Sequence, residues 1–355
     1  MEKYSQFRDR GSGIAPFTPI FTPTSKIYLP IRIFIFLARL PIFVALTLGY
    51  FIVLQCLPLG SLFKKAMLWM ILGVPGVWWV DLQVDGVKKG SLAKHSPRLP
   101  NPSNIIASSF TSPIDALYLA AIFDPIFTAS YPTTRLIHRI SLLRAILRAL
   151  SPPQSRPLPG TALTDLGTLL RDHPNRIIVV FPETTTTNGR GILPFSPSLL
   201  TAPSTTRIFP VSVRYTPPDI TTPVPHAYWA FLWNLLSRPT HCIRVRIAEC
   251  VYNGPEGYPY PQRATPQPSS KSTHATNYLD TPPSSSEAED ITPSRKASSI
   301  NNGDITTDEK RLLEKVGEAL ARLGRVKRVG LGVRDKVAFV EVWERQNYRR
   351  FRWLR

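Results

Sequence analysis

Polar residues of the types that bind phosphate groups follow an apolar run in the middle of the chain. Residues 177–180 are two isoleucines and two valines, which is typical of a buried strand. Pro182 ends the run because proline lacks the N–H that strand pairing requires. Glu183 comes next, where open α/β sheets place their ligands, and Thr185 and Arg190 follow in a loop with glycine. This arrangement suits a polar substrate that carries a phosphate.

The same stretch also has a purely structural interpretation. Asn188 and Gly189 stand between two extended runs, and this pair is a strong signal for a β-hairpin turn. The polar residues would then serve only to shape the turn. The residue pattern alone is compatible with both interpretations.

A second carboxylate, Asp115, lies upstream in a sequence that starts a helix. Ser112 is placed as the N-cap, Pro113 as the first helical residue and Asp115 as the third, which is the pattern of a capping box. In that case the carboxylate is structural. The alternative is functional, because desolvation beside the ring of Phe110 would raise the pKa of Asp115 toward that of a usable base.

The run from residue 181, FPETTTTNGRGILPF, resembles the third sequence motif of the glycerolipid (lysophospholipid) acyltransferases. Thr184 stands where that family usually has a glycine. Residues 109–115, SFTSPID, resemble the first motif, HxxxxD, and Phe110 takes the place of its histidine. Residues 208–211, IFPV, resemble the fourth motif. The matches to the third motif are Phe181, Pro182, Glu183, Thr185, Asn188, Gly189 and Arg190.

This resemblance implies acyl transfer to a hydroxyl group. In the family, the histidine of the first motif takes the hydroxyl proton and the aspartate orients the histidine ring. By resemblance, Asp115 would serve the chemistry. Glu183, Thr185 and Arg190 would hold the phosphate and the glycerol of the acceptor. The resemblance implies no metal and no bound cofactor, since acyl-CoA is a co-substrate.

Phe110 has no proton to exchange, so another group must act as the base if the chain is catalytic. His138 is a candidate that could approach in space. The arginine of the second motif has three candidates in a basic amphipathic run. The alternative interpretation of that run is a solvated or membrane-facing surface. The three candidates are Arg135, Arg139 and Arg144.

Two further stretches, QVDGVKKGSL and FTSPIDALYLAAIF, resemble the fungal lysophosphatidic acid:oleoyl-CoA acyltransferase group of this family. That resemblance implies transfer from acyl-CoA to lysophosphatidic acid, which gives phosphatidic acid. It also implies a place at the endoplasmic reticulum membrane or the lipid droplet, with the catalytic domain facing the cytosol. A second hypothesis is a non-catalytic lipid-binding or scaffolding protein with the same fold, which Phe110 and Thr184 would allow.

The chain is strongly basic, with a net charge of +19 and a pI near 10.2. Such a charge favours acidic partners, either nucleic acid or an anionic membrane surface. The C-terminal residues interleave arginines with aromatic rings, which could stack on single-stranded nucleic acid or lie on a bilayer. The apolar N-terminal region favours membrane lipids over nucleic acid.

The three cysteines form no CxxC pair, which favours reduced thiols on the cytosolic side and argues against a structural zinc site.

Membrane attachment is predicted from the N-terminal region. Residues 40–63 contain no charged side chain and are long enough to cross a bilayer core. Residues 66–80 form a shorter apolar segment with Trp69, Trp78 and Trp79, which suits a re-entrant or interfacial helix. The alternative interpretation is a helix buried in the core of a soluble domain.

Strand patterns alternate with helix patterns in the central region, which predicts an α/β fold with a mostly parallel sheet flanked by helices. The Ser-, Thr- and Pro-rich residues 254–307 are predicted to be a disordered insertion. Expected strands are 80–86, 103–109, 126–129, 177–180, 207–215 and 242–250. Expected helices are 112–122, 133–150, 161–172, 225–237, 309–323 and 334–348. The predicted division is a flexible tail (1–25), membrane-anchoring helices (26–80), the α/β domain (81–253), the disordered linker (254–307) and a basic helical segment (308–355).

Overall fold

The computed structural model describes residues 2–54, 60–88, 92–225, 227–254 and 306–352. The strands of its central sheet are β1 (Val77–Val84), β2 (Ile105–Ser108), β3 (Ile126–Tyr131), β4 (Thr134–Ile140), β5 (Ile178–Val180), β7 (Arg207–Thr216), β8 (His241–Ile247) and β9 (Val251–Tyr252). Their order is β1–β8–β7–β2–β5–β3–β4, with β9 paired to β7. The pairs β7–β2, β2–β5, β5–β3 and β1–β8 are parallel. This mostly parallel sheet confirms the predicted α/β fold.

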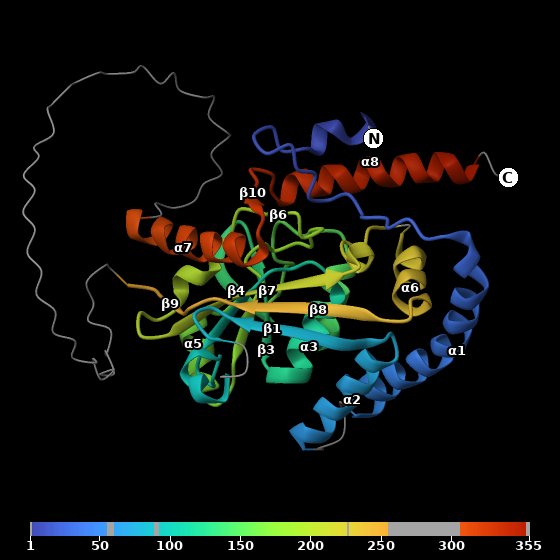
Figure 1. The fold of residues 1–355 in the computed structure, drawn as a ribbon. Coiled ribbons are helices and arrows are strands. Elements are labelled where there is room, and N and C mark those ends of the chain that lie inside the picture. Colours follow the sequence, from blue (N-terminus) through green and yellow to red (C-terminus); the bar gives the residue numbers. More distant parts are fainter. Residues whose placement is uncertain (1, 55–59, 89–91, 226, 255–305, 353–355) are drawn as a thin grey trace, which may run out of the picture.

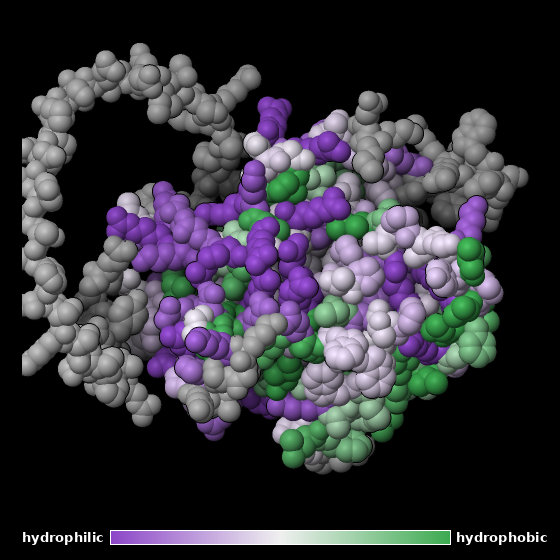
Figure 2. Space-filling model, in the orientation of Figure 1, coloured by the Kyte–Doolittle hydropathy of each residue, from purple (hydrophilic) through white to green (hydrophobic). Residues whose placement is uncertain are grey.

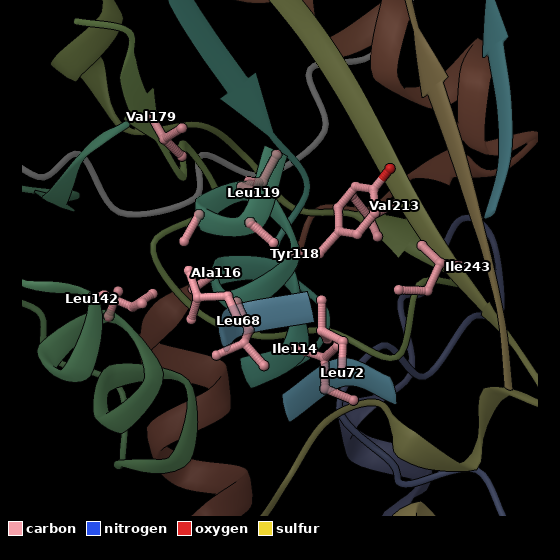
Figure 3. Packing of buried hydrophobic residues seen from close by; sticks show 14 of the residues in the cluster. Leu68, Leu72, Ile114, Ala116, Tyr118, Leu119, Leu142, Val179, Val213 and Ile243 are labelled. Carbon is pink, nitrogen blue, oxygen red and sulfur yellow. The ribbon is translucent and has the colours of Figure 1, made fainter. Parts of the chain in front are cut away.

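Helices cover both faces of the sheet (Figure 1). One face packs on α2 (Ser61–Gly73), α3 (Pro113–Phe123) and α4 (Leu142–Leu150). Figure 3 shows this core, in which Tyr118 of α3 is 1% exposed. Burial of a side chain of this size contributes roughly 2–3 kcal/mol. The other face packs on α5 (Leu166–Asp172) and α7 (Thr307–Gly324).

The predicted helix at residues 133–150 is wrong in its first half. Thr134–Ile140 forms β4, which pairs antiparallel with β3, and only Leu142–Leu150 is helical. A turn before Thr134 brings β4 beside β3, and Ile137 enters the core from this strand. Ser141 then caps α4 by accepting a hydrogen bond from the backbone of Arg144. The predicted helix at 161–172 likewise begins later, at Leu166, where Asp165 is the N-cap.

The apolar N-terminal helix is α1 (Leu29–Leu48), which continues through Gly49–Leu54. By length and composition, Lys26–Leu54 suffices to cross a membrane. Arg32 and Arg39 of this helix contact the domain, at Ser237 of α6 (Tyr228–Ser237) and at the carbonyl that follows it. Residues 77–80, which the predicted membrane-anchoring region 26–80 includes, instead pair with β8 as the start of β1.

The N-terminal segment, predicted to be a flexible tail, instead packs along α8 (Val333–Arg352), as Figure 1 shows. Phe7 and Phe17 are buried, and their ring centroids lie 5.3 and 6.1 Å from that of Phe339. The prediction differs from the structure because the partner of these rings lies at the other end of the chain.

The last two helices confirm the predicted helices 309–323 and 334–348. Thr306 and Glu309 form a capping box that starts α7 at Thr307. The predicted disordered linker 254–307 lies almost wholly outside the described residues, of which only its two ends are part.

Candidate active site

Asp115 lies fully buried in the first turn of α3, where it completes the predicted capping box. Its Oδ2 accepts hydrogen bonds from the backbone N–H groups of Thr111 (2.6 Å) and Ser112 (2.9 Å). Its Oδ1 accepts from the hydroxyl of Tyr215 on β7 at 2.5 Å. Burial raises the pKa of Asp115 to about 6, although these hydrogen bonds oppose the shift. The capping box confirms the structural interpretation of this residue, and the functional interpretation stays a prediction that the raised pKa supports.

Glu183 lies directly beyond the carboxyl end of β5 and is also buried. Its Oε2 accepts from the backbone N–H of Leu193 at 3.3 Å, whereas its Oε1 has no hydrogen-bond partner among the described residues. Burial raises the pKa of Glu183 to about 8, and the nearby charge of Asp115 adds to the shift. At neutral pH the structure therefore favours a protonated Glu183 beside an ionised Asp115.

Phe110 occupies the position of the family's histidine and is 2% exposed. Its ring stacks on that of Phe181, with centroids 4.4 Å apart and planes inclined by 25°. The carbonyl of Phe110 accepts from the backbone N–H of Thr187 at 2.9 Å. The ring thus packs in the apolar core and offers no group that could accept a proton.

The loop after Glu183 is not a β-hairpin. β6 (Gly191–Ile192) pairs with β10 (Lys327–Arg328) and not with β5, so the structural alternative for Asn188 and Gly189 is wrong. The loop is instead buried as far as Asn188.

The loop brings Thr185 close to Glu183 but places Arg190 at the surface. The backbone N–H of Thr185 donates to the carbonyl of Glu183 at 2.7 Å, and Thr185 is buried. Arg190 is exposed. Thr184 has φ of 59°, a left-handed conformation that glycine adopts without strain, which explains the glycine that the family usually carries there.

Lys336 is a site residue that the sequence interpretation missed. It is 3% exposed, and its Nζ donates to the carbonyl (2.5 Å) and the Oγ1 (2.6 Å) of Thr186. Burial lowers the pKa of Lys336 to about 7, while Glu183 favours its charged form. One sequence signal could have identified Lys336. It lies at helical spacing between Val333 and Val340, with which it shares the buried face of α8.

The N-terminal segment completes the cover over this loop. The side-chain Nδ2 of Asn188 donates to the carbonyls of Ala15 (2.8 Å) and Thr18 (3.0 Å) in this segment. The backbone N–H of Asn188 donates to the carbonyl of Pro16, and its Oδ1 accepts from the backbone N–H of Arg190 within the loop. A cavity of about 10 Å³ lies beside Glu183, enough for about one water molecule. The cavity is lined by residues that include Ser109, Thr111, Glu183, Thr187 and Arg214.

The remaining sequence candidates lie elsewhere. His138 is on the outer strand β4, and its Nδ1 is 3.0 Å from the carbonyl of Ala162. Arg135 forms a salt bridge with Glu309 of α7 at 2.6 Å. Arg139 and Arg144 are exposed on β4 and α4, away from the residues that line the cavity. None of these side chains contacts Asp115 or Glu183 in the described part of the chain.

This arrangement suits proton transfer. Asp115 is ionised at neutral pH, but burial brings its pKa close enough for it to accept a proton from a substrate hydroxyl. A protonated Glu183 can donate a hydrogen bond to a substrate oxygen. Over the described residues, no group of three or more His, Cys, Asp or Glu side chains could hold a metal ion.

Comparison with known proteins points to one group of enzymes. No model of a known protein family matches the chain. The chain is 27% identical over 266 residues to the putative lysophosphatidic acid:oleoyl-CoA acyltransferase of Schizosaccharomyces pombe, covering 70% of this chain and 84% of that protein. It is 28% identical over 197 residues to lysophosphatidic acid:oleoyl-CoA acyltransferase 1 of Saccharomyces cerevisiae, covering 55% of this chain and 61% of that protein. These similarities support the resemblance of the chain to the glycerolipid acyltransferases, and the two buried carboxyl groups lie at the positions of that family's motifs.

Proposed function

We propose that this protein transfers an acyl chain from acyl-CoA to lysophosphatidic acid and thereby forms phosphatidic acid. The observation that carries the proposal is the buried pair Asp115 and Glu183, which lies at the motif positions of the family. The names of the two fungal relatives support the same pair of substrates.

Asp115 takes the place of the missing histidine as proton acceptor. The acceptor hydroxyl loses its proton to Asp115 as its oxygen attacks the thioester carbonyl. The new C–O bond forms, the C–S bond breaks, and the proton returns to the thiolate sulfur of coenzyme A. The hydroxyl of Tyr215 and the backbone of Thr111 hold the carboxylate in place during these steps.

Glu183, Thr185 and Arg190 hold the acceptor. Protonated Glu183 donates a hydrogen bond to a glycerol oxygen, and Thr185 lies beside it in the loop. Arg190 is exposed at the end of the same loop, so it is accessible to a phosphate at the surface.

The reaction takes place at a membrane surface. Arg32 and Arg39 are turned to the domain, so α1 presents its apolar residues outward. Trp78 and Trp79, 69% and 70% exposed, continue this surface at the start of β1, and tryptophan is enriched at membrane interfaces. Figure 2 shows the apolar surface along α1 and α2. Membrane lipids are thus partners of the protein. We place it at the endoplasmic reticulum or the lipid droplet, with the α/β domain in the cytosol.

A non-catalytic lipid-binding protein is the second candidate, because Phe110 fills the place of the histidine with a stacked ring. One assay distinguishes the two candidate functions. Purified full-length protein in detergent receives labelled oleoyl-CoA and lysophosphatidic acid, and labelled phosphatidic acid is measured. The proposal predicts product in the wild type. Lysophosphatidic acid binding without product would support the second candidate instead.

Arg190→Ala tests the acceptor site in the same assay. Loss of one charge-assisted contact at this exposed position should weaken the apparent affinity for lysophosphatidic acid by about tenfold. Arg311→Ala is the matched control, since Arg311 is an exposed arginine at the start of α7. An unchanged KM for the acceptor in Arg190→Ala would remove Arg190 from the site.

A further inference from the structure

Three arginines lie together on the face of the sheet that carries α7. Arg214 of β7 is directly opposite Arg244 of β8, and Arg246 lies two residues further along β8 on the same face. Like charges that face each other across strands destabilise a sheet. Arg244 and Arg246 lower the pKa of Arg214, in addition to the larger effect of burial. Such a cluster is stabilised when an anion binds to it.

The partners of these arginines within the chain are mostly neutral. Arg214 donates to the carbonyls of Gly324 and Gly189, and Arg246 donates to the carbonyl of Leu323 at 2.8 Å. The Nε of Arg246 is buried without a hydrogen-bond partner among the described residues. These contacts fix the directions of the guanidinium groups but do not neutralise them. Arg244 is 3.5 Å from Asp81.

An open groove of about 670 Å³ runs beside this cluster, between the edge strand β1 and the end of α7. That volume is typical of a site for a small organic ligand. Figure 2 shows hydrophilic side chains gathered over this region, apart from the apolar surface of α1 and α2. The charged residues of the groove wall are Asp81, Asp85, Lys88, Arg246, Arg322 and Arg325.

The groove lies at a defined distance from the candidate active site. Arg214 and Gly324 line the small cavity together with Glu183 and Thr111. β2, which leads into the first motif, is followed by β7, β8 and β1 in the sheet. At about 4.8 Å per strand, β8 and β1 lie about 10–14 Å from β2. The pantetheine arm of coenzyme A is about as long as four residues of extended chain, which is about 14 Å.

We propose that this arginine groove binds the phosphates of the nucleotide part of a coenzyme A thioester. The inference rests on the proposed function, because it assigns a place to the acyl donor of that reaction. A ligand with several phosphates matches the clustered arginines, and its arm is long enough to reach from the groove to the first motif, which follows β2. A membrane surface fits less well. The groove begins at Val80, next to the exposed Trp79, but its basic residues Lys88, Arg322 and Arg325 lie toward its other end, and Lys88 follows β1.

The test measures binding without turnover. Coenzyme A and adenosine 3′,5′-bisphosphate are titrated by calorimetry into purified full-length protein in detergent. Arg322→Gln and Arg325→Gln each remove one exposed charge from the groove wall, and each should weaken binding of both ligands by about tenfold at low salt. Arg311→Gln, outside the groove, should bind them as the wild type does. Affinity for coenzyme A that is equal in all four proteins would overturn the proposal.

A second arm separates the nucleotide from a lipid surface. Flotation with phosphatidylserine vesicles should be the same in the groove variants and the control. If the variants lose vesicle binding but retain coenzyme A binding, the groove is a membrane contact and the inference is wrong. The failure of the proposed function looks different. In that case the wild type forms no phosphatidic acid, yet its coenzyme A binding still depends on Arg322 and Arg325.

Discussion

Asp115 and Glu183 are both buried, yet their different surroundings give them different pKa values. Asp115 accepts hydrogen bonds from two backbone N–H groups and from the Tyr215 hydroxyl, and its pKa rises only to about 6. Glu183 has fewer donors, lies near the charge of Asp115, and its pKa rises to about 8. Under the proposed function, this difference in pKa suits Asp115 to accept a proton and Glu183 to donate a hydrogen bond.

The raised pKa of Glu183 predicts a pH-dependent stability. The folded state holds the proton up to about pH 8, whereas the unfolded state releases it near 4.5. The stabilisation is therefore fully present below pH 4.5 and is lost as the pH rises through 8, by roughly 3–5 kcal/mol in total. Glu183→Gln should abolish this part of the decline.

Chemical denaturation between pH 5 and pH 8.5 measures the effect. The matched control is Glu249→Gln, which changes an exposed glutamate and should retain the wild-type slope. A Glu183→Gln protein with the same slope as the wild type would show that Glu183 is already ionised in the folded state.

At the scale of elements, the site is held from two ends of the chain. The N-terminal segment binds Asn188, and α8 binds Thr186 through Lys336. Most strands of the central sheet and the start of α3 could be predicted, because apolar runs and capping patterns are local in sequence. The cover could not be predicted, because Phe17 and Phe339 are 322 positions apart and nothing local links them. The sequence did not predict β4 for the same reason. Its pairing with β3 outweighs the helical pattern of the residues that follow it.

Phe17→Ala tests the cover. Phe17 is fully buried, so its truncation should cost about 3–4 kcal/mol of stability in this part of the molecule. Amide hydrogen exchange in residues 183–190 should become faster, because the loop loses its support. Phe21→Ala is the control, since Phe21 is 65% exposed. Unchanged exchange in the loop of Phe17→Ala would mean that the N-terminal segment does not restrain the site.

At the scale of the whole molecule, charge and apolar surface are segregated. The apolar side chains of α1 and α2 gather on one side, and the hydrophilic groove lies on another (Figure 2). Under the proposed function, membrane insertion through the apolar side would leave the groove in water, where a soluble acyl donor could reach it. The acceptor lipid and the donor would then approach the site from different directions.

The tryptophans at the start of β1 provide a test of this orientation. The double variant Trp78→Ala, Trp79→Ala removes two exposed rings from the interface and should reduce vesicle flotation several-fold. Its melting temperature should remain near that of the wild type, because neither ring is part of the core. Leu158→Ala is a control that changes an exposed apolar residue outside the N-terminal region. Equal flotation of the double variant and the wild type would exclude these rings from the membrane contact.

The most direct test of the central claim is the turnover of Asp115→Asn in the oleoyl-CoA assay. Asparagine can still cap α3, so the variant should fold, but it cannot accept the hydroxyl proton. We predict that kcat falls by about 10²- to 10⁴-fold while both KM values stay within a few-fold of the wild type. Asp165→Asn, at the N-cap of α5, should retain full activity. Wild-type kcat in a folded Asp115→Asn protein would contradict the account.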